Sequence, residues 1–148
     1  MAHPTSAHPS VRLAADDHRR LRILVDEIDA ALAGRGPRRA HGPDVAAARL
    51  ALLRGLLRAH FDEEERAGLF DQIVEIAPDQ ARACSLLRAE HGSLLARLDE
   101  LRAAGPEARR YATWTSGVRA LLDTLSAHEA RESEILTRVL DGGAPAQD

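Results

Sequence analysis

Hydrophobic residues recur at alternating spacings of three and four along most of the chain, which is the period of an amphipathic α-helix. The clearest case runs from Trp114 to Val139, where spacings of four and three alternate along the whole stretch. Glycine and proline interrupt the pattern at only a few places, chiefly around Gly34, at Gly105 and after Leu140. The pattern predicts four long helices and a short helical extension over residues 69–77, which follows a bend or an end of the second helix at Gly68. The long helices are expected at about residues 13–33, 44–66, 79–104 and 107–140.

Four helices with short connections predict one all-α domain, an antiparallel up-down-up-down four-helix bundle. We expect the bundle to occupy residues 13–140, between disordered tails at residues 1–12 and 141–148. The composition agrees, because 45% of the residues are hydrophobic and only 3% are aromatic. A core built from Leu, Ala, Val and Ile suits helices better than sheets.

Charge and cysteine content exclude several classes of protein. The net charge is −3, with 20 basic and 23 acidic residues interspersed and no basic stripe, so we expect no nucleic-acid partner. No apolar stretch is long enough to span a bilayer, so we expect no membrane association. The single cysteine, Cys84, excludes an internal disulfide, and the N-terminus has no apolar signal segment. We therefore expect a cytoplasmic protein.

Each predicted seam is apolar except at one level, where it carries histidine and glutamate. These residues are His18, His60, Glu64, His91, His128 and Glu132. Burying such groups in a leucine core costs several kcal/mol unless they are paired or bind a metal. In an up-down-up-down bundle the four histidines all fall roughly 20 to 30 Å from the same end, at about 1.5 Å per residue. We therefore expect the six side chains to converge on one layer.

The spacing within two of the helices suggests what they share. His60 and Glu64 are four residues apart, as are His128 and Glu132, which puts each pair on one helix face. An imidazole and a carboxylate so placed can bind neighbouring metal ions, with the carboxylate bridging them. Four imidazoles and two carboxylates suit iron, manganese or zinc, and contain too much nitrogen for calcium or magnesium.

Other metal sites known from helices do not fit the sequence. The ferritin-like carboxylate site needs a glutamate three residues before a histidine. The residues three before His60, His91 and His128 are Leu57, Arg88 and Leu125, and none is acidic. The His-Glu-x-x-His helix of metalloproteases is also absent.

The series of His18, His60-x-x-x-Glu64, His91 and His128-x-x-x-Glu132 resembles the bacterial hemerythrin-like domain, the HHE cation-binding family. The resemblance covers about residues 13–140 and implies a non-haem site with two iron ions bridged by an oxo or hydroxo group. It implies that His18 and His60 bind one iron and that His91 and His128 bind the other. Glu64 and Glu132 would bridge the two ions. The implied ligands are dioxygen, peroxide or nitric oxide.

One departure from the family pattern bears on function. Oxygen-carrying hemerythrins have a further histidine one turn from the histidine of the third helix, but here the residues four either side of His91 are Leu87 and Leu95. One iron would then keep an open position, which favours reactivity over simple oxygen carriage. Three classes of function remain. They are a gas-binding or sensing module that needs a protein partner, a peroxide-decomposing enzyme whose catalytic residues the sequence does not identify, and a metal-free interaction bundle.

The remaining polar residues have less specific interpretations. Glu90 and Glu129 are interpreted as surface residues or as supports for the ligands, and Glu63 and Glu65 as a solvated charge run. Cys84 is interpreted as a small buried apolar residue. We expect the other histidines to be exposed to solvent; these are His3, His8 and His41.

Overall fold

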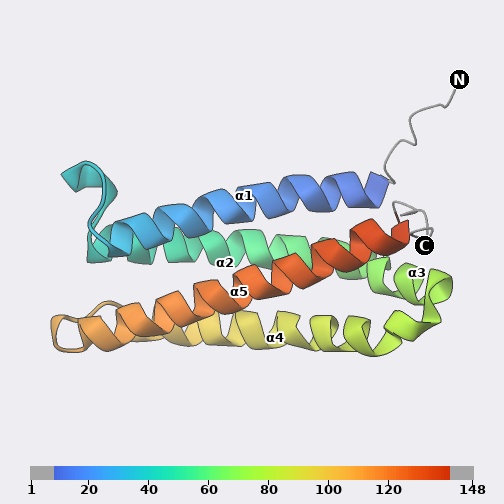
Figure 1. Ribbon diagram of the computed structural model, residues 1–148. Coiled ribbons are helices and arrows are strands. Elements are labelled where there is room, and N and C mark those ends of the chain that lie inside the picture. Colours follow the sequence, from blue (N-terminus) through green and yellow to red (C-terminus); the bar gives the residue numbers. More distant parts are fainter. Residues whose placement is uncertain (1–8, 141–148) are drawn as a thin grey trace, which may run out of the picture.

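The computed structural model describes residues 9–140, and this part of the chain is all-α, with five α-helices and no strand (Figure 1). Four of them are long, and the fifth, α3, has only 8 residues. The α-helices are α1 (Pro9–Leu32), α2 (Pro43–Arg66), α3 (Leu69–Ile76), α4 (Ala81–Ala104) and α5 (Tyr111–Leu140). Single 3-10 turns precede three of the long helices, at Arg38–Ala40, Pro78–Gln80 and Ala108–Arg110.

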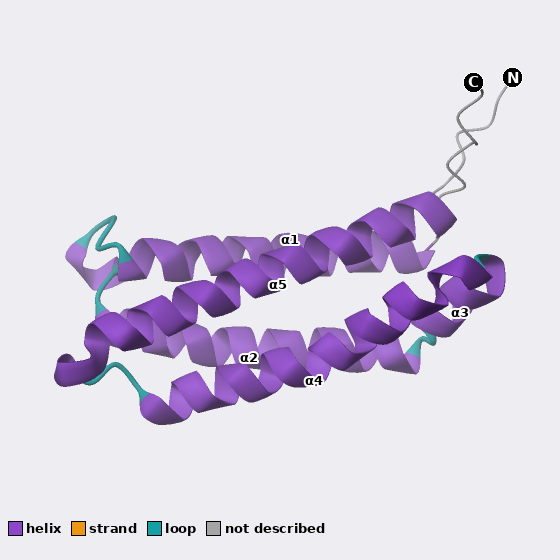
Figure 2. Cartoon of the chain, turned by 60° about the horizontal axis from the view of Figure 1, so that its bottom comes forward, coloured by secondary structure: helices purple, strands orange, loops and turns teal. Residues whose placement is uncertain are grey.

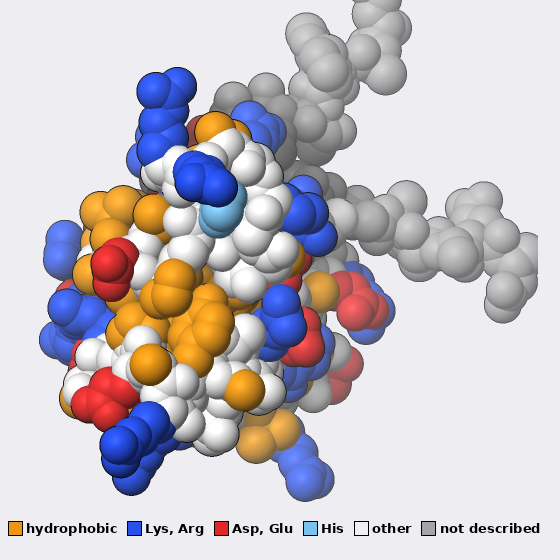
Figure 3. Space-filling view, turned by 90° about the vertical axis from the view of Figure 1, so that its left-hand side faces the viewer, with side chains coloured by type: hydrophobic (Ala, Val, Ile, Leu, Met, Phe, Trp, Pro, Cys, Tyr) orange, Lys and Arg blue, Asp and Glu red, His pale blue; other side chains and the backbone are white. Residues whose placement is uncertain are grey.

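The four long helices form a bundle in which each has two neighbours. Helix α1 packs against α2 and α5, and α4 packs against the same two (Figures 1 and 2). The start of α1 and the end of α5 lie at the end of the bundle where α3 lies (Figure 1). Figure 3 shows the opposite end, where hydrophobic side chains are visible at the centre and arginine and acidic side chains lie around them.

The helix boundaries follow the predicted pattern with two differences. Helix α1 begins at Pro9, earlier than the expected start near Leu13. The predicted extension after α2 is a separate helix, because Gly68 adopts a left-handed conformation with φ of 67° and breaks the path of the backbone. The predicted terminal tails fall mainly on residues 1–8 and 141–148, which lie outside the described residues.

Two apolar clusters make up the core, and a layer of buried histidine and glutamate side chains separates them. This polar layer consists of His18, His60, Glu64, His91, His128 and Glu132. The larger cluster fills the bundle towards the end away from α3, and the smaller one joins α3 to α4 and α5. On α4, His91 lies between Leu87 of the smaller cluster and Leu94 of the larger one. On α5, His128 and Glu132 likewise lie between residues of the two clusters. The polar residues therefore form a layer within the core and not a surface patch.

No helix within residues 9–140 is both long enough and apolar enough to cross a membrane.

Candidate metal centre

The structure brings all six of the predicted site residues together inside the bundle. They come from the four long helices, and none is more than 7% exposed. These residues are His18 on α1, His60 and Glu64 on α2, His91 on α4, and His128 and Glu132 on α5. The helical pairs contribute as their spacing predicts, since side chains four residues apart lie on one face.

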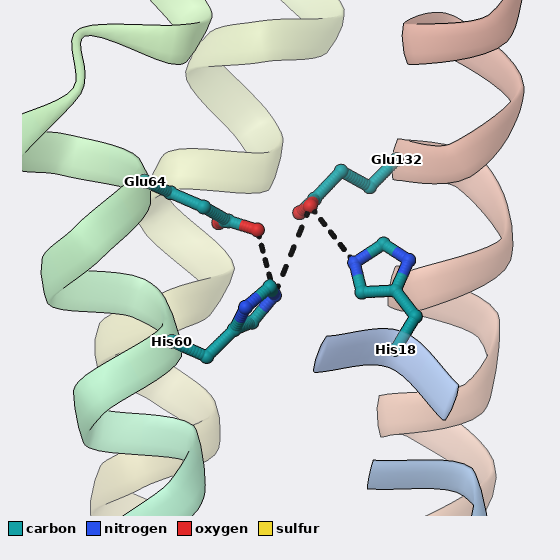
Figure 4. A group of neighbouring side chains, drawn as sticks. All are labelled: His18, His60, Glu64 and Glu132. Carbon is teal, nitrogen blue, oxygen red and sulfur yellow. Dashed lines mark hydrogen bonds and ion pairs between the residues drawn. The ribbon is translucent and has the colours of Figure 1, made fainter. Parts of the chain in front are cut away.

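Four of these residues form a group that could hold one metal ion, as Figure 4 shows. They are His18, His60, Glu64 and Glu132. Their potential ligand atoms all lie within 4.8 Å of one another. The Nε2 atom of His60 lies 2.7 Å from Oε1 of Glu64. The Nε2 atom of His18 lies 3.1 Å from Oε1 of Glu132.

His91, His128 and Glu132 form a second group that meets the same criterion. The Nε2 atom of His128 lies 3.3 Å from Oε2 of Glu132, and that of His91 lies 3.2 Å from Oε2 of Glu64. Both carboxylates therefore direct one oxygen to each histidine pair. This is the arrangement needed for a carboxylate that spans two neighbouring ions.

The outward-facing nitrogens of three histidines have hydrogen-bond partners of their own, and that of His91 has a carboxylate nearby without a hydrogen bond. The Nδ1 atom of His18 lies 2.8 Å from Oγ of Ser133, and that of His60 lies 3.2 Å from a carboxylate oxygen of Asp17. The Nδ1 atom of His128 lies 2.7 Å from Oε2 of Glu90, and that of His91 lies 3.6 Å from Oε1 of Glu65. A metal-binding imidazole commonly has such a partner on its other nitrogen, which sets its tautomer and orientation.

Most of the inward-facing atoms, in contrast, lack hydrogen-bond partners; Nε2 of His18 and Oε1 of Glu132, which hydrogen-bond to each other at 3.1 Å, are the exception. Within the described residues, the unpaired buried atoms include Nε2 of His60, His91 and His128, both oxygens of Glu64 and Oε2 of Glu132. Several of them are in close contact but are not aligned for hydrogen bonding. Buried polar atoms are rarely left unpaired, because each costs about 1 to 3 kcal/mol. Lone pairs that converge without mutual hydrogen bonds fit a shared cation, so these residues suit a metal ion.

The charges of the metal-free site are strongly coupled. Burial lowers the pKa of His18, but the carboxylates of Glu129 and Glu132 outweigh it and raise the pKa to about 10. Burial also opposes the charge of His60, whereas Glu64 and the other nearby carboxylates raise its pKa to about 9. Burial would raise the pKa of Glu64, but His60 and His91 lower it to about 2. Without metal, protons on His18 and His60 therefore offset part of the carboxylate charge.

Glu129 approaches the site more closely than its sequence position suggested. Its side chain is only 13% exposed, and its Oε2 atom lies 2.7 Å from Nε2 of His18. It is three residues before Glu132, a spacing that places both carboxylates on one side of α5 and that could have identified it. Glu90, Asp17 and Glu65 remain outside the histidine pairs.

Aromatic side chains surround the histidines on one side. The ring of Phe61 stacks on His91 at 3.8 Å between centroids, with an interplanar angle of 6°. Phe61 is 1% exposed, and the ring of Phe70 lies 5.6 Å from that of His91. Neither phenylalanine was identified from the sequence as part of the site. They shield the His91 side from water.

The other candidates from the sequence lie away from the ligand groups. Cys84 is buried in the smaller apolar cluster, as predicted, and burial raises the pKa of its thiol. His41 lies in the connection between α1 and α2 and is half-buried, not exposed as expected. His3 and His8 lie outside the described residues.

A pocket of about 290 Å³ lies between α1 and α5 and reaches the polar layer. His18 and Glu129 line it, together with Arg22, Leu125 and Ser133. His18 and Glu129 therefore border a pocket on the α1–α5 side, and a second pocket, of about 260 Å³ between α1 and α2, borders His60.

Comparison with known proteins gives one match. The family model of the hemerythrin HHE cation binding domain matches residues 10–140, which include every residue of the polar layer. No curated protein and no solved structure matches the chain.

Proposed function

The chain belongs to the hemerythrin HHE cation binding domain family, and on this premise we propose that it is a non-haem protein that holds a pair of iron ions. In this proposal the four long helices are the antiparallel four-helix bundle of the family, and α3 is an addition to it. The metal ligands would be His18, His60, Glu64, His91, His128 and Glu132.

The observation that carries the proposal is the arrangement of Glu64 and Glu132. Each is at most 5% exposed and directs one oxygen to the His18–His60 pair and the other to the His91–His128 pair. Two bridging carboxylates between two imidazole pairs imply two ion positions and not one. The mixed nitrogen and oxygen donors are those that iron accepts.

An iron pair in this site would supply redox electrons and coordination positions for dioxygen, peroxide or nitric oxide. The residues of the chain would perform three other tasks. The Nδ1 partners orient the imidazoles, the carboxylates offset the charge of the ions, and the apolar clusters exclude bulk water. Phe61 and Phe70 give the His91 side an apolar surface suited to small uncharged ligands.

A second candidate function, peroxide decomposition, is favoured by the residues around His91. Leu87 and Leu95, one turn either side of it, have no metal-binding atoms. The ion held by His91 and His128 would therefore have fewer protein ligands than an oxygen carrier provides. Evolution of oxygen from added peroxide, at many turnovers per iron, would distinguish this enzyme from a binding or sensing protein.

Elemental analysis and absorption spectroscopy test the proposal. Protein produced in iron-replete medium should contain about two irons per chain, because both ion positions have imidazole and carboxylate donors. An oxo bridge between the two irons should give near-ultraviolet charge-transfer bands. His60→Ala and Glu132→Ala should lower the iron content. His41→Ala, which removes a histidine from a loop, is the matched control and should leave it unchanged. A colourless wild-type protein without metal, or full iron content in both site variants, would refute the proposal.

A further inference from the structure

We propose that Glu129 is a seventh metal ligand, a carboxylate that binds only the ion held by His18 and His60. The inference rests on the proposed function, because it concerns how the ion pair is bound. It adds a residue beyond the six identified from the sequence, and it makes the two ion positions unequal.

The first argument is which nitrogen of the histidines each carboxylate contacts. Glu64 and Glu132, the two proposed bridging ligands, contact Nε2 atoms, which point into the site. Asp17, Glu65 and Glu90 contact Nδ1 atoms, which point away from it. The nitrogen that a carboxylate contacts therefore distinguishes the two groups: the inner carboxylates contact Nε2 and the outer carboxylates contact Nδ1.

Glu129 belongs with the inner group by this criterion. Its Oε2 atom lies 2.7 Å from Nε2 of His18, and its Oε1 atom lies 3.9 Å from Nε2 of His60. Nδ1 of His18 is already in contact with Ser133. A carboxylate on the Nε2 side therefore faces the space that an ion bound by His18 and His60 would share.

The second argument is that both oxygens of Glu129 are buried and lack a hydrogen-bond partner. The same holds for Nε2 of three of the histidines, both oxygens of Glu64 and Oε2 of Glu132, whereas Nε2 of His18 hydrogen-bonds to Oε1 of Glu132. A carboxylate that served only to orient His18 would be aligned as a hydrogen-bond acceptor from its ring, as the carboxylate of Glu90 is for His128. The absence of this alignment favours a role towards a cation.

The contacts of Glu129 also indicate a terminal ligand and not a third bridge. Both of its oxygens lie near the His18–His60 pair, and neither lies within 4.0 Å of a nitrogen of His91 or His128. The His18–His60 ion would therefore have two imidazoles and three carboxylates, and its partner ion would have two imidazoles and two carboxylates. Open positions would be concentrated on the ion beside Phe61.

The position of Glu129 on the pocket gives the extra ligand a consequence. Glu129 and His18 both line the pocket between α1 and α5, so a Glu129 carboxylate bound to the ion would lie on the pocket side of it. Bound there, it would occupy the coordination position that faces the pocket. An external ligand arriving from this side would have to displace it.

Mössbauer spectroscopy and chelation kinetics on ⁵⁷Fe-loaded protein test the proposal. Glu129→Gln preserves the shape of the side chain but removes the charged donor. It should alter the spectral doublet of one of the two irons and leave the other unchanged. A chelator should remove one iron from the variant about tenfold faster than from the wild type, with the second iron released at the wild-type rate. Glu129→Asp, which keeps the charge but shortens the reach, should alter the same doublet.

Glu134→Gln is the matched control, since Glu134 is a carboxylate on the same helix and is 65% exposed. It should change neither the spectrum nor the release rates. Wild-type doublets and release rates in Glu129→Gln would show that Glu129 is only a neighbour of His18 and would overturn the inference. Equal changes at both irons would overturn it as well. These outcomes leave the proposed function intact, whereas wild-type protein without iron would overturn both.

Discussion

The outer carboxylates should affect metal affinity in a graded order, Glu90 first, Asp17 second and Glu65 last. Each contacts the Nδ1 atom of a different histidine. Glutamine or asparagine at these positions therefore removes a charge while every proposed ligand stays in place. Removing such a partner typically weakens metal binding by about 10 to 100-fold, which corresponds to about 1.4 to 2.8 kcal/mol. The structure determines where in this range each residue falls.

Distance and exposure set the order. Glu90 lies 2.7 Å from Nδ1 of His128 and is 28% exposed. Burial alone would raise the pKa of Glu90, but His128 and Arg131 outweigh it and lower the pKa, which shows that the interaction favours the carboxylate. Asp17 lies 3.2 Å from His60 and is 36% exposed. Glu65 lies 3.6 Å from His91 and is 50% exposed.

We therefore expect Glu90→Gln to weaken metal binding by about tenfold or somewhat more, since Arg131 loses a partner but the ring of His128 remains held by burial. Asp17→Asn should weaken it by a few-fold, and Glu65→Gln by less than twofold, because solvent screens the more exposed and more distant charge. Competition with a chromophoric chelator measures the three dissociation constants. Unfolding of the metal-free variants provides the control for stability.

Two results would refute the reasoning. One is equal affinity for all three variants, which would mean that the outer carboxylates do not act through the imidazoles. The other is the reverse order, with Glu65→Gln the weakest binder. Either result would mean that metal affinity does not depend on the strength of the Nδ1 contacts.

Two further predictions follow from the site. Phe61→Ala should destabilise the metal-free protein by about 3 to 5 kcal/mol, because it leaves a cavity against His91, and a loss below about 1 kcal/mol in urea unfolding would contradict the packing described here. Metal binding at pH 7.5 should release about two protons per chain, one each from His18 and His60, whose pKa values of about 10 and about 9 keep them protonated without metal. Affinity should accordingly rise as the pH approaches these pKa values. Proton uptake or release in a weakly buffered titration with an indicator dye checks this, and no release would show that the histidines are neutral before metal binds.

The fold follows from the sequence because its signals are local and repeated. The seam of α5 from Trp114 to Val139 can be read without knowledge of any neighbour, and the prediction of an all-α bundle from the hemerythrin-like family is confirmed. The sequence left open whether Gly68 bends or ends the second helix, and the structure shows that Gly68 ends it by adopting a positive φ. A glycine near a helix end fits a bend as well as a break.

The composition of the site is predictable only in part. His128 and Glu132 stand out because histidine and glutamate in an apolar seam have a high cost, and this signal needs no neighbour. Glu129 gives no such signal, since a glutamate beside a seam is ordinary on a helix surface. Its burial depends on α1 covering this side of α5, which is a property of packing. The role of the seven residues as ligands remains a prediction.

The Nδ1 contacts connect each long helix to the next around the bundle. Three of them are hydrogen bonds, and the fourth is the looser contact between Glu65 and His91. Helix α1 supplies Asp17 to a histidine of α2, and α2 supplies Glu65 to one of α4. Helix α4 supplies Glu90 to His128 of α5. Helix α5 in turn supplies Ser133 to His18 of α1. No helix orients its own histidine, so rotation or sliding of any one helix misaligns an imidazole on its neighbour. Loosening of the bundle should therefore also weaken ion binding, because a displaced helix carries away the group that orients an imidazole on its neighbour.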